Sequence, residues 1–257
     1  MIKSPELKDF LEEKYDKYNR QGFIESDPIS IPHQFTQKED IEIAGFLAAT
    51  IAWGQRVTII KNANKLMNLM GNNPHDFLLS ARLKDFQKFD SFVHRTFNGE
   101  DAVFFMKALQ NIYKKQGGLE NVFMNNSSNN DATLNAITNF RKTFFSIEHT
   151  HRTRKHISNP SENSSAKRLC MYLRWMVRND KRGVDFGIWK SSLLPSHLMC
   201  PLDVHSGNVA RKLGLLKRTQ NDWKAVEELT ANLRKFDAKD PVKYDFALFG
   251  LGVFEKF

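Results

Sequence analysis

A lysine and an aspartate in the last hundred residues are of the right types for covalent chemistry at a sugar carbon. Lys167 falls in the first turn of a helix that we expect over residues 166–179. The positive end of a helix disfavours an ammonium there and favours a neutral, nucleophilic amine. Asp203 precedes a second helix that stops at Gly214, so we expect it to be an N-cap that stays ionised. The ordinary alternatives are a solvated lysine and a purely structural cap.

The elements that must position these residues are helices. Apolar residues recur at spacings of three and four along stretches such as 41–53, 102–115 and 134–147. We find no internal repeat and no pair of strands, so the sequence predicts an all-α fold. We expect a capping box at Thr36–Glu39, a Ser164 or Ser165 cap on the helix over 166–179, and an Asp245 cap on the last helix.

Two polar stretches interrupt the helical pattern. Residues 125–131 read as a polar loop, and residues 149–168 are basic and polar with no apolar face. We interpret the second stretch as a hinge or a loop that faces nucleic acid.

The charge balance favours a polyanionic partner. The chain has 38 Lys and Arg against 29 Asp and Glu, a formal net charge of +9, and contacts with phosphates release condensed counterions. The alternative is a cationic surface that is merely solvated. Only Cys170 and Cys200 are present and neither belongs to a CxxC pair, so we expect no zinc or iron–sulfur site and no other metal or cofactor. Without a signal peptide or a run of about 18 apolar residues, we expect a cytoplasmic protein that spans no membrane.

Two segments resemble the helix-hairpin-helix (HhH-GPD) DNA glycosylase superfamily. PLDVH (201–205) is similar to the segment that holds its aspartate, and SAKRLCMYLRW (165–175) is similar to the end of its hairpin and the start of the next helix. Lys167 and Asp203 fall on the superfamily's lysine and aspartate. Their separation of 36 residues (167 to 203) is closest to the archaeal-type 8-oxoguanine DNA glycosylases. More narrowly, LRWMVRND, GVDFGIWK, PLDVH and DPVKYDFALFGLG resemble a bacterial family of unknown function.

The superfamily resemblance implies one glycosylase-like domain over residues 1–257, with two helical lobes around a cleft. Residues 36–160 would form a helical lobe and residues 161–257 a hairpin and catalytic lobe, with residues 1–35 packing across. The implied function is a base-excision DNA glycosylase with AP-lyase activity on oxidised purines such as 8-oxoguanine. Lys167 would form a Schiff base, and Asp203 would stabilise the positive charge that develops on the sugar.

The implied partner is double-stranded DNA with a damaged base, RNA being an alternative, and we expect a monomer. The stretch AWGQR (52–56) matches a base-contacting region, which makes Trp53, Gln55 and Arg56 candidates for base contacts; a core role for Trp53 is the alternative. His205, Arg168 and Arg211 are candidates for phosphate contacts, although His205 is equally consistent with an ordinary histidine.

One feature departs from the superfamily. Its hairpin has a glycine-rich turn that grips a DNA phosphate, whereas the matching stretch ISNPSENSSAK (157–167) has no glycine. This departure favours an alternative function, a binding module that recognises DNA or RNA without cutting it.

Overall fold

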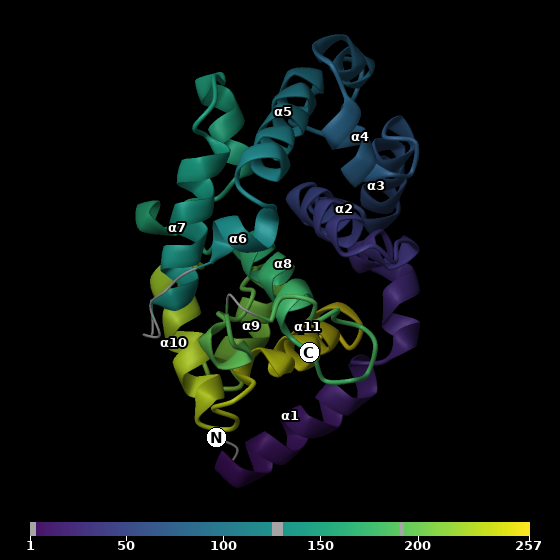
Figure 1. Ribbon diagram of the computed structural model, residues 1–257. Coiled ribbons are helices and arrows are strands. Elements are labelled where there is room, and N and C mark those ends of the chain that lie inside the picture. Colours follow the sequence, from purple (N-terminus) through teal and green to yellow (C-terminus); the bar gives the residue numbers. More distant parts are fainter. Residues whose placement is uncertain (1–3, 125–130, 191–192) are drawn as a thin grey trace. The chain divides into compact units, whose positions relative to one another are not determined.

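The computed structural model describes residues 4–124, 131–190 and 193–257, and these residues form an all-α fold (Figure 1). Helices and short 3-10 turns account for the regular structure described, apart from an isolated bridge between His94 and Phe97. The predicted fold class is therefore confirmed. Of the polar loop expected over residues 125–131, all but Asp131 lies outside the described residues.

The helices follow one another in this order: α1 (Ser4–Tyr18), α2 (Lys38–Thr50), α3 (Arg56–Leu69), α4 (Pro74–Ser80), α5 (Gly99–Lys115), α6 (Leu119–Phe123), α7 (Ala132–Phe144), α8 (Lys167–Val177), α9 (Val204–Lys212), α10 (Trp223–Arg234) and α11 (Asp245–Val253). Short 3-10 turns connect several of them, among them η5 (His151–His156), η6 (Pro160–Glu162) and η8 (Pro241–Tyr244).

The chain divides into two compact units. Unit 1 comprises the described parts of residues 1–23, 125–137 and 158–257, and unit 2 comprises residues 24–124 and 138–157. Unit 1 thus combines both ends of the described chain with α8 to α11, and α7 is divided between the units. The segment over residues 1–35, which we expected to pack across the lobes, is divided, with residues 24–35 in unit 2.

Unit 2 is organised around α2, which is apolar on nearly all sides and almost entirely buried. Phe46 of this helix contacts the rings of Phe105, Phe140 and Phe144, with ring centroids 5.3 to 6.0 Å apart. Rings in these stacked and edge-on arrangements add to the energy of apolar burial. The aromatic cluster therefore holds α2, α5 and α7 together within this unit.

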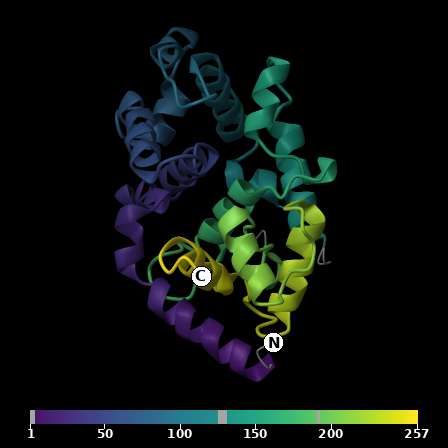
Figure 2. The same ribbon diagram turned by 180° about the vertical axis from the view of Figure 1, so that it is seen from behind.

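In unit 1, α11 packs against both α1 and α9, an arrangement visible from front and back (Figures 1 and 2). Two glycines of α11 allow this close approach. A Cβ at Gly250 would lie 2.1 Å from the Tyr18 ring, and one at Gly252 would lie 3.2 Å from the backbone of His205. Just beyond the helix, Glu255 accepts hydrogen bonds from Lys14, Lys17 and Tyr18.

Three of the predicted caps are wrong. Helix α2 begins after Gln37 and has no side-chain cap, so Thr36 and Glu39 form no capping box. Helix α8 begins after Ala166, whose backbone is left-handed, rather than after a serine cap. Asp245 is the first residue of α11 rather than its cap, because its carboxylate is paired with Arg174 instead of the helix amides.

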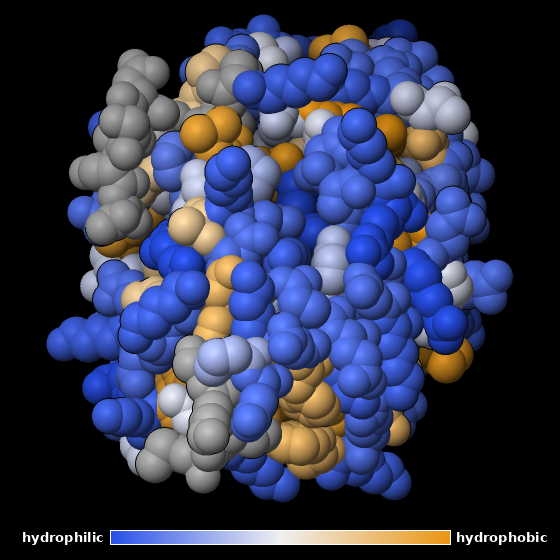
Figure 3. Space-filling model, turned by 90° about the horizontal axis from the view of Figure 1, so that it is seen from below, coloured by the Kyte–Doolittle hydropathy of each residue, from blue (hydrophilic) through white to orange (hydrophobic). Residues whose placement is uncertain are grey.

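No helix among the described residues is long and apolar enough to cross a membrane. Hydrophilic side chains cover most of the face shown in Figure 3.

The contact between α1 and α11 gives a first test. Alanine favours a helix by about 1 kcal/mol over glycine, yet at position 250 its methyl group must displace the Tyr18 ring. We expect Gly250→Ala to lower the free energy of unfolding by about 1–3 kcal/mol, measured by urea denaturation. Gly22→Ala is the matched control, because a Cβ there has no neighbour within 4 Å. Equal stability of the two variants would contradict the proposed close packing.

Candidate active site

Lys167 and Asp203 lie side by side in unit 1. Lys167 Nζ is 3.4 Å from Asp203 Oδ2, and the two side chains are 26% and 27% exposed. Lys167 is the first residue of α8, and Asp203 immediately precedes α9. The structure therefore brings together the two residues that the sequence singled out, at a place that solvent reaches.

Asp203 is the N-cap of α9, as predicted. Its Oδ1 accepts hydrogen bonds from the backbone N–H groups of His205 (2.9 Å) and Ser206 (3.0 Å). In return, the N–H of Asp203 donates to Ser206 Oγ at 3.0 Å. Burial alone would raise the pKa of Asp203, but the Lys167 ammonium and the hydrogen bonds outweigh burial and hold that pKa below its ordinary value. Asp203 is thus anionic at neutral pH, with Oδ2 directed at Lys167.

The turn that leads into α8 is built without glycine. Asn163 and Ala166 both adopt left-handed backbone conformations, with φ of 63° and 46°. The side chain of Asn159 accepts a hydrogen bond from Ser161 N, and Ser164 Oγ accepts one from Ala166 N. Asparagine tolerates this conformation, whereas alanine adopts it at a cost of about 1 kcal/mol or more. Side-chain hydrogen bonds and burial of Ala166 therefore stabilise a turn that glycine would make without strain.

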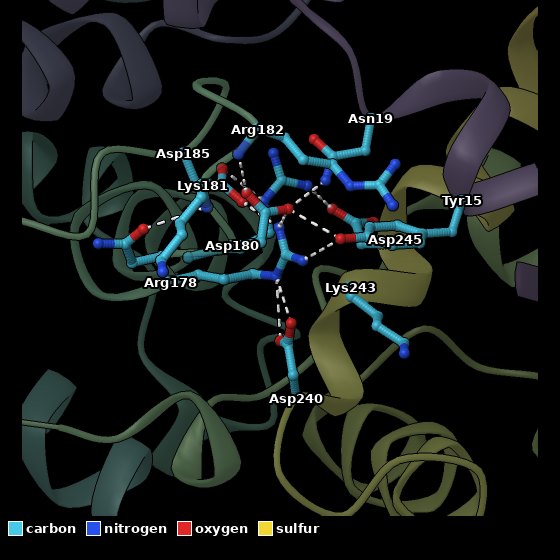
Figure 4. A network of polar contacts seen from close by, with 12 residues as sticks. Tyr15, Asn19, Arg178, Asp180, Lys181, Arg182, Asp185, Asp240, Lys243 and Asp245 are labelled. Atoms are coloured by element: carbon cyan, nitrogen blue, oxygen red, sulfur yellow. Dashed lines mark hydrogen bonds and ion pairs between the residues drawn. The ribbon is translucent and has the colours of Figure 1, made fainter.

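Two buried arginines, Arg174 in α8 and Arg178 at its C-cap, are paired with carboxylates, and Figure 4 shows the contacts of Arg178. Arg174 donates hydrogen bonds to Asp185 at 3.2 Å and to Asp245. Arg178 donates to Asp185 at 3.0 Å and to Asp240 at 2.8 Å. Asp185, shared by both arginines, links the two halves of the network.

The network continues to α1. Arg178 Nη2 donates to the hydroxyl of Tyr15 at 2.8 Å, and that hydroxyl donates to Asp180 at 2.8 Å. Burial would lower the pKa of Arg178, but Asp185 and Asp240 outweigh it and raise that pKa, so the guanidinium stays charged. Helix α1, α8, the loop after α8 and turn η8 are therefore fixed to one another by buried charges.

Asp245 connects this network to the candidate pair. Its carboxylate is buried, and burial raises its pKa to about 6, although Arg174 and Lys167 oppose the rise. The negative charge of Asp203 acts in the same direction as burial. Cys170 is also buried beside Asp245, and burial raises the pKa of its thiol to about 12, so it stays protonated.

The remaining candidates in unit 1 differ in their surroundings. His205 is exposed at the start of α9. Arg168 is partly exposed, and partial desolvation of its guanidinium lowers its pKa to about 10. The guanidinium of Arg211 donates to the backbone oxygens of Arg218 and Thr219, both at 2.8 Å, and to the side chain of Asn221. Arg211 therefore holds the loop between α9 and α10.

Trp53, Gln55 and Arg56 lie in unit 2, where Trp53 is partly exposed. Its ring meets His94 edge-on, with centroids 4.9 Å apart, and lies parallel to His156 at 6.0 Å. Gln55 is exposed and precedes α3, which begins at Arg56. Trp53 therefore contacts two histidine rings and is partly exposed, an intermediate between the core and surface alternatives.

The basic stretch over residues 149–168 includes a buried anchor in unit 2. Asp101 on α5 accepts hydrogen bonds from Arg152 (2.8 Å), Thr153 (2.8 Å) and His156 (3.0 Å). Thr153 and His156 are buried. Part of this stretch is therefore fixed by internal contacts rather than extended as a loop.

The charged residues that support the site were not predicted from the sequence. Arg174 and Arg178 interrupt the apolar pattern of α8 at a spacing of four, which was the available signal for a buried charged row. Also not predicted was Arg95, an exposed residue with φ of 55° whose guanidinium lies against Gly54, next to Trp53. No sequence pattern pairs Arg95 with Gly54, because 41 residues (54 to 95) separate them.

We expect Arg178→Met to lower the free energy of unfolding by about 3–5 kcal/mol, because it leaves buried Asp185 and Asp240 without a main counter-ion. Arg182→Gln is the control, since its ion pair with Asp16 is exposed and contributes about 1 kcal/mol or less. Chemical denaturation of both variants measures the difference. Similar losses in both variants would mean that burial does not increase the contribution of these ion pairs to the free energy of unfolding.

Substitution of Asp203 separates its capping role from its charge. Asp203→Ala should cost about 1 kcal/mol of stability, and Asp203→Asn only a few tenths, because asparagine also caps helices. The folded-state pKa of Asp203 is lowered, so its ionised carboxylate stabilises the fold above the unfolded pKa of about 4. The advantage of wild type over the Asn variant should shrink as pH falls below that value. Urea titrations at pH 7 and pH 3 test this, and an advantage that grows in acid would contradict it.

Comparison with known proteins places the chain in a family. A family model described as "Protein of unknown function (DUF2400)" matches residues 27–254. No curated protein and no solved structure matches the chain. The match spans most of unit 1 and all but three residues of unit 2, including Lys167, Asp203 and the buried arginine network. The chain belongs to the DUF2400 family.

Proposed function

We propose that this protein is a DNA glycosylase with AP-lyase activity that excises a damaged base through a Schiff base on Lys167. The observation that carries the proposal is the 3.4 Å contact between Lys167 Nζ and the partly exposed carboxylate of Asp203. The resemblance of both segments to the helix-hairpin-helix glycosylase superfamily supports it. Among substrates, oxidised purines such as 8-oxoguanine are the proposed class.

The reaction begins when the damaged base leaves the stack, which costs a few kcal/mol. The free amine of Lys167 then attacks the anomeric carbon while the bond from that carbon to the base breaks. The base leaves with the bonding electrons and takes up a proton, and the lysine nitrogen loses one. Positive charge develops on the sugar during this step, and the anionic carboxylate of Asp203 stabilises it.

The covalent intermediate then opens to a Schiff base between Lys167 and the sugar. Loss of the proton on the adjacent sugar carbon expels the 3′ phosphate by β-elimination, which nicks the strand. Hydrolysis of the Schiff base releases the amine of Lys167. These steps need a nucleophilic amine and a fixed negative charge, and the side chains of Lys167 and Asp203 supply them.

The proposed partner is double-stranded DNA, and the proposed site of action is the cytoplasm. The net charge of +9 favours the phosphate backbone. His205 and Arg168 flank the candidate pair in sequence and are proposed to contact phosphates, with Arg211 adding positive charge on α9. Trp53, Gln55 and Arg56 are proposed to contact bases, since the ring of Trp53 is partly exposed and aromatic rings stack on bases.

A binding module without catalysis is the second candidate, and the glycine-free turn favours it. Cβ atoms at Asn163 and Ala166 stand where a glycine-rich turn would let its backbone approach a phosphate closely. A protein of this kind would bind DNA or RNA without forming a covalent intermediate.

Borohydride trapping on oligonucleotides with an oxidised purine or an abasic site tests the proposal. We expect wild type to form a covalent adduct and to nick the strand. Lys167→Gln should abolish both, because no amine remains, while binding to DNA persists. Asp203→Asn should keep the helix cap but slow excision about 100- to 1,000-fold, because the negative charge is lost.

Two controls make the result decisive. Binding of each variant to the same DNA, followed by fluorescence anisotropy, shows that loss of activity is not loss of binding. Lys190→Gln is the matched lysine control, since Lys190 is an exposed lysine of unit 1 outside the candidate pair. Wild-type protein that binds DNA but is never trapped would overturn the glycosylase and favour the binding module.

A further inference from the structure

We propose that Trp53 and Arg95 of unit 2 form a binding site for an unpaired nucleotide of single-stranded DNA. An indole ring stacks on a base, and a guanidinium binds a phosphate. The site goes beyond the proposed function: it shares Trp53 with that function but requires neither Lys167 nor any covalent step. The two can therefore be tested separately.

Two pairs of neighbouring residues meet at this place. Trp53 and Gly54 come from the segment between α2 and α3, and His94 and Arg95 come from the turn that precedes α5. The ring of His94 meets the ring of Trp53 edge-on, with centroids 4.9 Å apart. A Cβ at Gly54 would lie 3.0 Å from Arg95 Nη1 and 3.3 Å from Arg95 Cδ. The guanidinium of Arg95 therefore lies against the backbone of the residue that follows Trp53.

Trp53 is held by two buried histidines. His94 Nε2 donates a hydrogen bond to the backbone oxygen of Trp53 at 3.2 Å, since a carbonyl oxygen can only accept. The other ring nitrogen of His94 lies 2.9 Å from Asn62 Nδ2. The ring of His156 lies nearly parallel to the indole, with centroids 6.0 Å apart. These contacts fix the indole before a ligand arrives, which reduces the entropy lost when a base stacks on it.

Arg95 lies in a tight turn that its own backbone disfavours. His94 and Phe97 close the turn through backbone hydrogen bonds of 2.8 and 2.9 Å. Arg152 donates a further hydrogen bond to the backbone oxygen of Thr96 at 3.0 Å. Arg95 has a φ of 55°, a left-handed conformation that is unfavourable for a residue with a long side chain. The turn is therefore held in this shape by its neighbours and presents Arg95 in a fixed position.

The charge of Arg95 is available to a ligand. Arg95 is exposed, and it has no ion pair and no side-chain hydrogen bond with any residue that the structure describes. Arg152, by contrast, is paired with Asp101 at 2.8 Å. Because no described carboxylate neutralises the guanidinium of Arg95, an incoming phosphate does not have to displace one.

The turn is anchored in the core of unit 2. Phe97 is fully buried, and its ring contacts Phe105 and His156, with centroids 5.0 and 4.9 Å apart. His156 is the same residue that lies against Trp53, and its Nε2 is 3.0 Å from Asp101 on α5. The supports of the indole and of the arginine turn therefore meet at one buried histidine within this unit.

An indole beside a guanidinium matches the chemistry of one unpaired nucleotide. Every base has a face on which an aromatic ring can stack, but in a duplex the neighbouring bases cover that face. A guanidinium offers N–H donors in the arrangement that a phosphate accepts. The formal net charge of +9 adds attraction for the phosphate chain. The ligand expected is therefore a single strand rather than an undamaged duplex.

Tryptophan fluorescence reports on this site directly. The chain has four tryptophans, of which Trp175, Trp189 and Trp223 are buried, whereas Trp53 is partly exposed. We expect an oligothymidylate of about 12 nucleotides to quench the fluorescence of the full chain. An undamaged blunt duplex of the same length and free thymidine monophosphate should both bind more weakly. Equal or tighter binding of either would overturn the assignment to a single strand.

Variants of Trp53 test the stacking contact, with affinity followed by the anisotropy of a labelled oligothymidylate. Trp53→Phe keeps an aromatic ring, so it should abolish the quenching but bind within a few-fold of wild type. Trp53→Ala removes the ring and should weaken binding about 5- to 100-fold. Quenching that persists in Trp53→Phe, or Trp53→Ala that binds like wild type, would overturn the proposal.

The salt dependence of binding tests the phosphate contact of Arg95. Arg95→Gln should lower the slope of log affinity against log salt by about 0.7, the value for one phosphate contact on a single strand. Arg82→Gln is the matched control, since Arg82 is another exposed arginine of unit 2, and it should keep the slope of wild type. A merely structural role for Arg95 would weaken binding without changing the slope. Equal slopes in the two variants would overturn the proposal.

Arg95→Asn separates binding from folding. Asparagine tolerates a φ of 55° better than arginine does, so the urea midpoint should equal or exceed that of wild type. Binding should nevertheless weaken, with the same lower salt slope as in Arg95→Gln. A stable Arg95→Asn variant that binds the oligothymidylate like wild type would contradict a role for the guanidinium.

The outcome is independent of the proposed function. Quenching by the single strand that is unchanged in Lys167→Gln, in a protein that borohydride never traps, would retain this site and reject the glycosylase. Trapping of wild type on damaged DNA, without quenching by the oligothymidylate, would reject this site and retain the glycosylase.

Discussion

The burial of Arg174 in α8 and Arg178 at its C-cap is the constraint on which the rest of unit 1 depends. Removing a guanidinium from water costs several kcal/mol, which only close carboxylates offset. Asp185 meets this need for both arginines, and Asp240 and Asp245 complete it. Since these carboxylates come from the loop after α8 and from the region of η8 and α11, satisfying the arginines fixes those segments in place.

The buried network fixes the geometry of the candidate site. Helix α8 cannot rotate without breaking the contacts of Arg174 and Arg178, so Lys167 at its start has a fixed direction. Asp203 is fixed separately by the amides of α9, and α9 is fixed by its contact with α11. Two supports, joined through α11, therefore define one short contact, which is how a rigid scaffold keeps reactive groups in position.

The fold meets the local demand for glycine in two different ways. Close helix contacts at Gly250 and Gly252 use glycine for the space it leaves, and no larger residue fits at Gly250 without moving Tyr18. The turn before α8 instead places Asn163 and Ala166 in left-handed conformations and stabilises them by local hydrogen bonds. The left-handed conformation is energetically unfavourable, and the turn that it forms orders the start of α8, next to Lys167.

The sequence by itself determined the all-α class, the helix at Lys167 and the cap at Asp203. Apolar spacing and capping are local patterns, and both can be recognised within a few residues of the sequence. It placed the two candidate residues correctly enough to expect them together. Only the tertiary structure decided that Ala166 rather than a serine precedes α8, and that Asp245 serves Arg174 rather than its own helix. It alone revealed the shared role of Asp185. These outcomes depend on which distant charges meet when helices pack, and a buried arginine outcompetes a helix end for a carboxylate because its desolvation must be offset.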